Sequence, residues 1–209
     1  MKYLILESQI KFFQESGFIE FENIFSSEEM QKLKNEIDNY FKNSSTDFLQ
    51  SYKSTRDLFR SSEFIRKFVL NNRIVSIVKN LTNRNQLRLC FDQAIYSNGS
   101  NPFDDKVLID DFFTFQGLLC LVVIKMDDTI FNDHTFLPKT KNNSVFLKPG
   151  SYLNFNGIFE VPQKYLLIGY SDFKTIYKPN STDPNGYNLK QLGYTHGDTL
   201  KDKTHPVIY

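Results

Sequence analysis

The stretch Leu87-Arg88-Leu89-Cys90-Phe91-Asp92-Gln93-Ala94-Ile95-Tyr96 alternates in polarity and predicts a β-strand. The sequence pattern changes there: helical patterns dominate before residue 85, and short apolar runs separated by turns follow it. The later runs that predict strands cover residues 112–125, 144–148, 152–155, 165–170 and 173–177. Helices followed by short strands predict an α+β fold, with a β-sandwich or barrel core preceded by N-terminal helices.

Helical signals fill the first third of the chain. Residues 8–16 carry apolar side chains on one side and stop at Gly17, a residue suited to a helix C-cap. The clearest helix begins at Ser26, which stands at capping-box spacing from Glu29 and precedes apolar residues at helical spacing. Weaker signals predict three more elements: a short strand at 18–21 and helices near 63–70 and 73–81.

The length of 209 residues suits one domain with a substantial core. We expect a single domain over residues 1–209. It divides into a mainly helical part (1–84), a β core (85–178) and an irregular C-terminal tail (179–209). The last four residues of the tail are apolar enough to dock back on the body of the protein.

Composition argues against several classes of partner. Lys and Arg number 25 and Asp and Glu number 24, so neither a nucleic-acid surface nor an anionic membrane surface is favoured. The apolar stretch at the start of the chain ends at Glu7, which makes it too short for the apolar region of a signal peptide. The longest apolar run, 117–124, is too short to span a bilayer. Cys90 and Cys120 lie in apolar runs and are expected to be buried, reduced thiols. These features together predict a cytoplasmic protein.

The N-terminal pattern Phe13-x-x-x-Gly17-Phe18-Ile19-x-Phe21-x-x-Ile24-Phe25-Ser26-x-Glu28-Glu29 is similar to the opening of phytanoyl-CoA dioxygenase-like proteins. The similarity resumes at Asp92-Gln93 and at Leu147-Lys148-Pro149-Gly150-Ser151-Tyr152-Leu153-Asn154-Phe155. This resemblance implies a double-stranded β-helix, a jelly-roll or cupin-like core. It also implies Fe(II) held by two histidines and one carboxylate, with 2-oxoglutarate anchored by a basic residue, usually Arg.

The residues that this chemistry requires are missing from their expected segments. No histidine lies between Asp92 and the apolar run at 112–125, and none lies in residues 156–162, where the distal ligand is expected. All six arginines lie at or before Arg88, which leaves Lys164 as the candidate anchor for 2-oxoglutarate. The sequence therefore favours a non-catalytic or diverged family member without a cofactor, which binds a small molecule or a protein partner at the barrel mouth.

Two other hypotheses stay open. His196-Gly197-Asp198 is an H-x-D triplet, and with His205 it would complete a ligand set for an active oxygenase that uses Fe(II) and 2-oxoglutarate. These residues lie in a loop-like tail without a rigid framework, so an ordinary polar loop is the favoured interpretation. His134 is likewise expected to be an exposed loop residue. The third hypothesis is a structural or interaction protein unrelated to the oxygenases.

Polar residues within apolar runs mark candidate pocket positions. These residues are Asp92, Gln93 and Gln116. A buried polar group needs a hydrogen-bond partner. Each of these residues therefore either lines the barrel cavity or faces solvent from a sheet that has one solvent-exposed face.

Overall fold

The computed structural model describes residues 4–97, 101–129 and 136–209. Its α-helices are α1 (Glu7–Ser16), α2 (Ser27–Lys42), α3 (Phe48–Ser54), α4 (Glu63–Val69), α5 (Asn72–Thr82), α6 (Ile109–Phe112) and α7 (Phe155–Phe159). The 3-10 helices are η1 (Leu58–Arg60) and η2 (Asn188–Leu192). The strands are β1 (Phe18–Phe21), β2 (Leu87–Tyr96), β3 (Lys106–Leu108), β4 (Phe115–Lys125), β5 (Ser144–Leu147), β6 (Tyr152–Asn154), β7 (Lys164–Tyr177) and β8 (Val207–Ile208).

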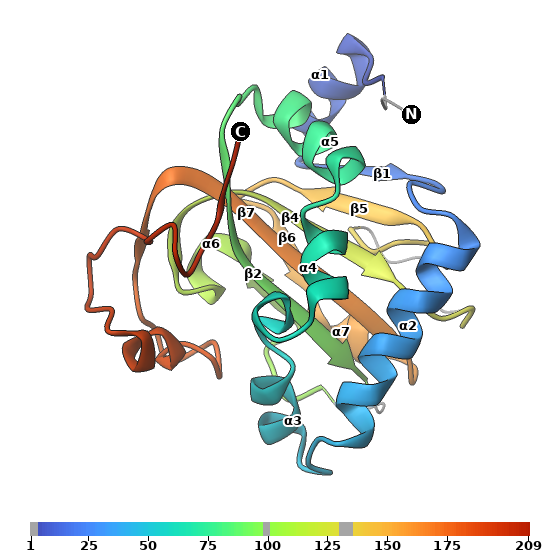
Figure 1. Ribbon diagram of the computed structural model, residues 1–209. Coiled ribbons are helices and arrows are strands. Elements are labelled where there is room, and N and C mark those ends of the chain that lie inside the picture. The colour runs from blue at the N-terminus through green and yellow to red at the C-terminus, as the bar shows by residue number, and fades with distance from the viewer. Residues whose placement is uncertain (1–3, 98–100, 130–135) are drawn as a thin grey trace.

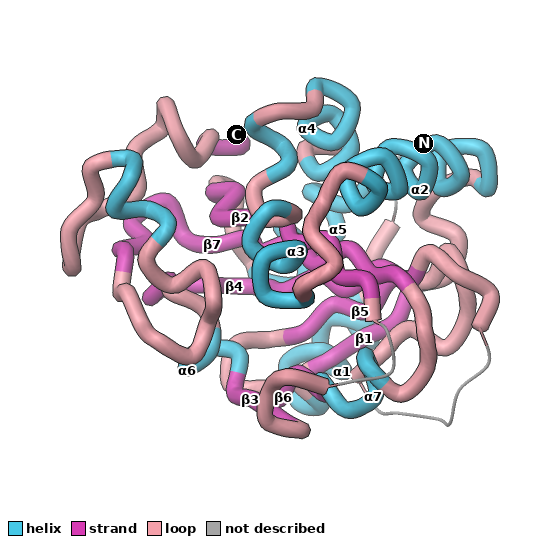
Figure 2. Tube along the Cα trace, turned by 90° about the horizontal axis from the view of Figure 1, so that it is seen from below, coloured by secondary structure: helices cyan, strands magenta, loops and turns pink. Residues whose placement is uncertain are grey.

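The strands pair into two antiparallel sheets (Figure 1). The larger sheet has six strands in the order β1-β5-β4-β7-β2-β8, and the smaller sheet pairs β3 with β6. Figure 2 shows α2, α4 and α5 on one side of the six-stranded sheet and β3, β6 and α7 on the other. The α+β class expected from the order of elements is therefore confirmed.

Each face of the six-stranded sheet packs against its own apolar core. On β4, Val122 and Ile124 belong to the core beneath the helices, whereas Leu121 and Val123 belong to the core between the two sheets. This division follows from the alternation of side chains along a strand. The sheet thus separates a helix-covered side from a between-sheet side, and any functional side chain lies on one or the other.

The start of α2 confirms the predicted capping box. The Ser26 Oγ accepts a hydrogen bond from the Glu29 N–H at 3.2 Å, and Glu29 Oε2 accepts one from the Ser26 N–H at 2.8 Å. Arg73 on α5 also pairs with the Glu29 carboxylate, which ties the two helices together. Gly17 ends α1 with φ of 79°, the left-handed conformation expected of a glycine C-cap.

The prediction of two strands over residues 165–177 was wrong. The structure has one continuous strand, β7, of 14 residues. Its pairing with β4 is nevertheless interrupted, because residues 172–175 of β7 lie opposite Gly117 alone, which has φ of 113°. The larger bulge is therefore on β7, close to the point at which the two predicted strands were divided. Phe173 and Lys174, within this segment, are exposed.

The C-terminal tail docks on the sheet, as its apolar end predicts. Val207 and Ile208 form β8 and pair with the start of β2. The buried Arg88 guanidinium fixes this tail, because it donates to the His205 carbonyl and to Asp202 Oδ1, the latter at 2.7 Å.

Both cysteines are buried and reduced, as expected. Among the described residues, no helix is long and apolar enough to cross a membrane.

Candidate functional site

Aromatic side chains fill the space between the two sheets. Phe112 of α6 packs edge-on against Phe113 and Phe155, with ring centroids 5.0 Å apart in both pairs. Phe91 of β2 stacks on Phe115 of β4 at 5.6 Å. A void of about 10 Å³ remains beside Arg56, a space for roughly one water molecule.

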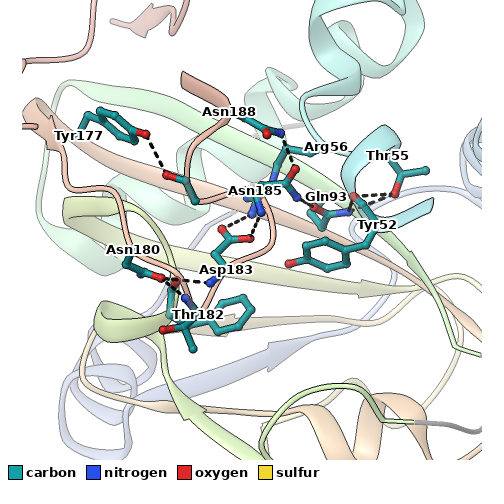
Figure 3. Close-up of polar contacts among 12 residues, drawn as sticks. Tyr52, Thr55, Arg56, Gln93, Tyr177, Asn180, Thr182, Asp183, Asn185 and Asn188 are labelled. Atoms are coloured by element: carbon teal, nitrogen blue, oxygen red, sulfur yellow. Dashed lines mark hydrogen bonds and ion pairs between the residues drawn. The ribbon is translucent and has the colours of Figure 1, made fainter. Parts of the chain in front are cut away.

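A buried cation lies at the edge of this aromatic core. Arg56 follows α3 and forms a β-bridge with Gln93. Its guanidinium carbon lies 4.3 Å from the ring centroid of Phe91 and 5.5 Å from that of Phe113. Its Nη2 donates to Asp183 Oδ2 at 2.5 Å, and the two side chains are only 4% and 0% exposed (Figure 3). Arg56 and Asp183 are thus an ion pair that solvent barely screens.

Amide side chains connect this ion pair to the sheet. The Asp183 carboxylate accepts a hydrogen bond from the Asn185 N–H at 2.9 Å, and the Asn185 Nδ2 donates to Gln93 Oε1 at 3.1 Å. Gln93 in turn donates to the Tyr52 carbonyl at 3.0 Å (Figure 3). The network therefore joins α3, strand β2 and the C-terminal tail. We call Arg56, Asp183, Asn185, Gln93 and Tyr52 the polar cluster.

The electrostatics of the polar cluster keep its arginine charged. Burial opposes ionisation of Arg56 most strongly, but the Asp183 carboxylate and other anionic neighbours outweigh it and raise the pKa of the guanidinium. Burial also raises the pKa of the Tyr52 phenol. Within the described part of the chain, Arg56 Nε, Arg56 Nη1 and the Tyr52 hydroxyl have no hydrogen-bond partner. The cluster therefore retains unused hydrogen-bond donors.

A groove of about 500 Å³ opens on the surface beside the polar cluster, between α3 and η2. Gln50 and Lys53 of α3 line one side of it. Asp57, Asn188 and Leu189 line both the groove and the small void beside Arg56. We call this groove the mouth, because it is the opening adjacent to the buried arginine.

The three polar strand residues separate in the structure. Gln93 belongs to the polar cluster, on the between-sheet side. Asp92 points to the helix-covered side, where its carboxylate accepts hydrogen bonds from the N–H groups of Leu58 at 3.0 Å and Phe59 at 2.9 Å. Burial, followed by the charge of Asp57, raises the pKa of Asp92 to about 7. Gln116 is exposed next to the bulge of β4.

Lys164 lies at the start of β7 on the helix-covered side. Its ammonium is 2.7 Å from Asp38 Oδ1 on α2 and 5.4 Å from the ring centroid of Tyr96. Leu166, two residues further and on the same face, belongs to the core beneath the helices. The structure therefore does not bring Lys164 together with the polar cluster, and its role as a 2-oxoglutarate anchor stays a prediction.

The tail residues considered as metal ligands have other partners. His196 is exposed, and Asp198 accepts hydrogen bonds from the Thr195 N–H at 2.7 Å and the Thr195 hydroxyl at 3.0 Å. His205 is buried, with Nε2 3.0 Å from Arg60 Nη2 and Nδ1 3.1 Å from the Tyr194 hydroxyl.

Burial, together with Arg60 and Arg88, lowers the pKa of His205 to about 3. In the described ranges, no three His, Cys, Asp or Glu side chains group as metal ligands, so the donors there do not fit a two-histidine, one-carboxylate site. His134 lies outside the described residues.

No family model matches the chain, and no curated protein matches it by sequence. Solved structures do resemble it in three dimensions. SnoK, a non-heme alpha-ketoglutarate-dependent carbocyclase from nogalamycin biosynthesis, matches with a TM-score of 0.75 at 12% identity, over 98% of this chain and 97% of SnoK. SnoN, an epimerase of the same type and biosynthesis, matches with a TM-score of 0.70 at 13% identity, over 97% of this chain and 98% of SnoN.

HygX from Streptomyces hygroscopicus, solved with nickel and 2-oxoglutarate bound, matches with a TM-score of 0.58 at 13% identity, over 93% of this chain and 97% of HygX. In these three structures the similarity spans at least 93% of both chains. At identities this low it concerns the fold alone. The chain therefore has the fold of non-heme, 2-oxoglutarate-dependent enzymes.

Proposed function

We propose that this protein is a diverged, non-catalytic member of the Fe(II)/2-oxoglutarate dioxygenase superfamily that binds a small molecule or a protein partner at the mouth. In this proposal the six-stranded and two-stranded sheets are the two halves of a distorted double-stranded β-helix. The sequence resemblance to phytanoyl-CoA dioxygenase-like proteins supports that origin. The fold shared with SnoK, SnoN and HygX supports the superfamily.

One observation carries the proposal: the ion pair of Arg56 and Asp183 is buried at the edge of the aromatic core, against Phe91 and Phe113. Enzymes of this superfamily hold a metal dication in the barrel with histidine and carboxylate ligands. This chain holds a fixed organic cation and its counter-carboxylate at the edge of its aromatic core. A buried guanidinium repels a nearby dication, and both ring nitrogens of His205 already have protein partners. The residues present thus suit a permanent salt bridge better than a metal centre.

The mouth offers a place for the bound partner. Its volume of about 500 Å³ lies within the range of small-molecule pockets, roughly 300–1,000 Å³. The void beneath it admits only about one water molecule, so a ligand would lie in the groove above Asn188 and Leu189. Lys53 and Arg60 bring two cations to the groove, and Asp57, 3.3 Å from Arg60, brings one carboxylate. The side chains of Gln50 and Asn188 supply neutral hydrogen-bonding groups.

Anaerobic titration with Fe(II), followed by measurement of iron per chain, tests the non-catalytic part of the proposal. We expect far less than one iron per chain, and the same value for the variant His196→Ala/Asp198→Asn. Because His196 is exposed, this variant should fold normally, which thermal unfolding checks. One iron per chain in the natural protein, lost in the variant, would overturn the proposal in favour of an active oxygenase with atypical ligands.

Calorimetric titration with 2-oxoglutarate tests the cosubstrate separately. We expect no saturable binding to the natural protein in the presence or absence of Fe(II). Saturable binding that Lys164→Met abolishes would instead assign Lys164 as the anchor and contradict the loss of cosubstrate chemistry.

A further inference from the structure

A second cavity, of about 620 Å³, lies on the helix-covered side of the six-stranded sheet. It is bounded by the C-terminal end of α2, the first turns of α3, the last residue of β2 and the first residue of β7. Figure 1 shows α2 and α3 flanking the end of β2. We call this space the helix-side cavity. It is larger than the mouth and shares no lining residue with it.

One wall of the helix-side cavity is aromatic. The rings of Phe41 on α2 and Tyr96 on β2 lie 5.8 Å apart, and Phe48 of α3 contributes a third ring. Tyr96 is 44% exposed, so its ring is open to the cavity. Aromatic faces open to a cavity can stack against a planar ring of a ligand.

Another part of the lining of the helix-side cavity carries positive charge. The Lys164 ammonium forms an ion pair with Asp38 at 2.7 Å, and an ammonium carries three N–H donors. Lys42 brings a second ammonium to the lining, so two cations face one carboxylate. The loop between α2 and α3 adds the hydroxyls of Ser44, Ser45 and Thr46, which can donate to an anion.

We infer that the helix-side cavity binds a small organic anion with a planar ring. The ring stacks on Tyr96 and Phe41, and a phosphate or carboxylate group accepts hydrogen bonds from Lys164 and the loop hydroxyls. Asp38 holds the Lys164 side chain in place and limits the affinity for anions through its own negative charge. This site goes beyond the function proposed for the mouth, because the two cavities share no lining residue.

Titration by calorimetry with phenyl phosphate and benzoate as probes tests the inference. Two half-probes each carry only one of the two groups: inorganic phosphate has the anion without the ring, and benzyl alcohol has the ring without the anion. We expect a ring-bearing anion to bind at least about tenfold more tightly than either half-probe, because ring stacking and charged hydrogen bonds act together. Comparison of phenyl phosphate with benzoate identifies the preferred acid group.

Two variants should act in opposite directions. Lys164→Met should weaken binding about tenfold or more, since it removes a charged donor. Asp38→Asn should strengthen binding several-fold, since it removes the competing carboxylate. Lys174→Met is the matched control, because the Lys174 ammonium also lies 5.4 Å from an aromatic ring, that of Phe173, at the other end of β7. The control should bind the probes like the natural protein.

Three outcomes would overturn the inference. Inorganic phosphate binding as tightly as phenyl phosphate would mean that the ring wall plays no part. Equal weakening by Lys164→Met and Asp38→Asn would mean that the ion pair only maintains the local structure. Absence of saturable binding by both ring-bearing anions, in protein whose melting is normal, would remove the site. None of these results depends on whether iron binds, so this inference and the proposed absence of a metal centre fail independently.

Discussion

Removal of one partner of the buried pair Arg56–Asp183 should destabilise the protein strongly. Asp183→Asn keeps the shape of the side chain and leaves the guanidinium without its counter-charge in a site that is only 4% exposed. Such a change typically costs about 3–5 kcal/mol of the free energy of unfolding. Since a domain has only about 5–15 kcal/mol in total, the loss should be plain in urea unfolding curves analysed by linear extrapolation.

Removal of both charges should cost less than the sum of the single changes. In Arg56→Met/Asp183→Leu no buried charge is left unpaired, and the methionine can pack against Phe91, which now lies 4.3 Å from the guanidinium carbon. A double-mutant cycle should therefore show a coupling of about 2 kcal/mol or more.

The exposed pair Lys67–Glu63 provides the matched control. Its atoms are 3.4 Å apart and its side chains are 75% and 73% exposed, so Glu63→Gln should change the free energy of unfolding by less than about 0.5 kcal/mol. The reasoning is refuted if Asp183→Asn costs no more than this control. In that case the guanidinium would be solvated or paired elsewhere, and the buried cation could not support loss of the metal site.

His205, Ser26 and Gly169 give further tests. The pKa of His205 is lowered from 6.5 to about 3, so its contribution to stability is present above pH 6.5 and is lost as pH falls towards 3. The natural protein should therefore lose about 2 kcal/mol more than His205→Gln between pH 7 and pH 5 in urea unfolding. Ser26→Ala should lower the free energy of unfolding by about 1 kcal/mol, measured by thermal melting, by loss of the α2 cap. Gly169→Ala should cost about 1–3 kcal/mol in urea unfolding, since its Cβ would lie 2.3 Å from the Phe91 ring; an unchanged midpoint would contradict that packing.

Features that depend on neighbouring residues could be predicted from the sequence. Ser26 and Glu29 are three residues apart, and Gly17 directly follows the helix that it ends, so their signals are local. The helix α3 was missed even though Asp47 caps it, because its seven residues are too few to show a clear period.

The polar cluster could not be predicted, because its members come from distant parts of the chain. Arg56 and Asp183 are separated by 127 residues. Each lies in a polar stretch, Ser54-Thr55-Arg56-Asp57 and Ser181-Thr182-Asp183-Pro184, that by itself predicts a solvated loop. Only the antiparallel sheet and the docked tail bring the two charges together. Gln93, at the end of a local strand pattern, was the one member that the sequence singled out.

The alternation of side chains along the central strands explains how one sheet can carry two separate sites. Asp92 and Gln93 are neighbours in sequence, yet one accepts hydrogen bonds from η1 and the other joins the polar cluster on the opposite face. Lys164 follows the same rule and faces α2. Because the apolar core of the sheet separates the two faces, charge changes in the helix-side cavity should leave the Arg56–Asp183 coupling unchanged, as expected for sites without shared contacts. A Lys164→Met background that altered that coupling would show that the two sites communicate through β7, and the protein would then have one site rather than two.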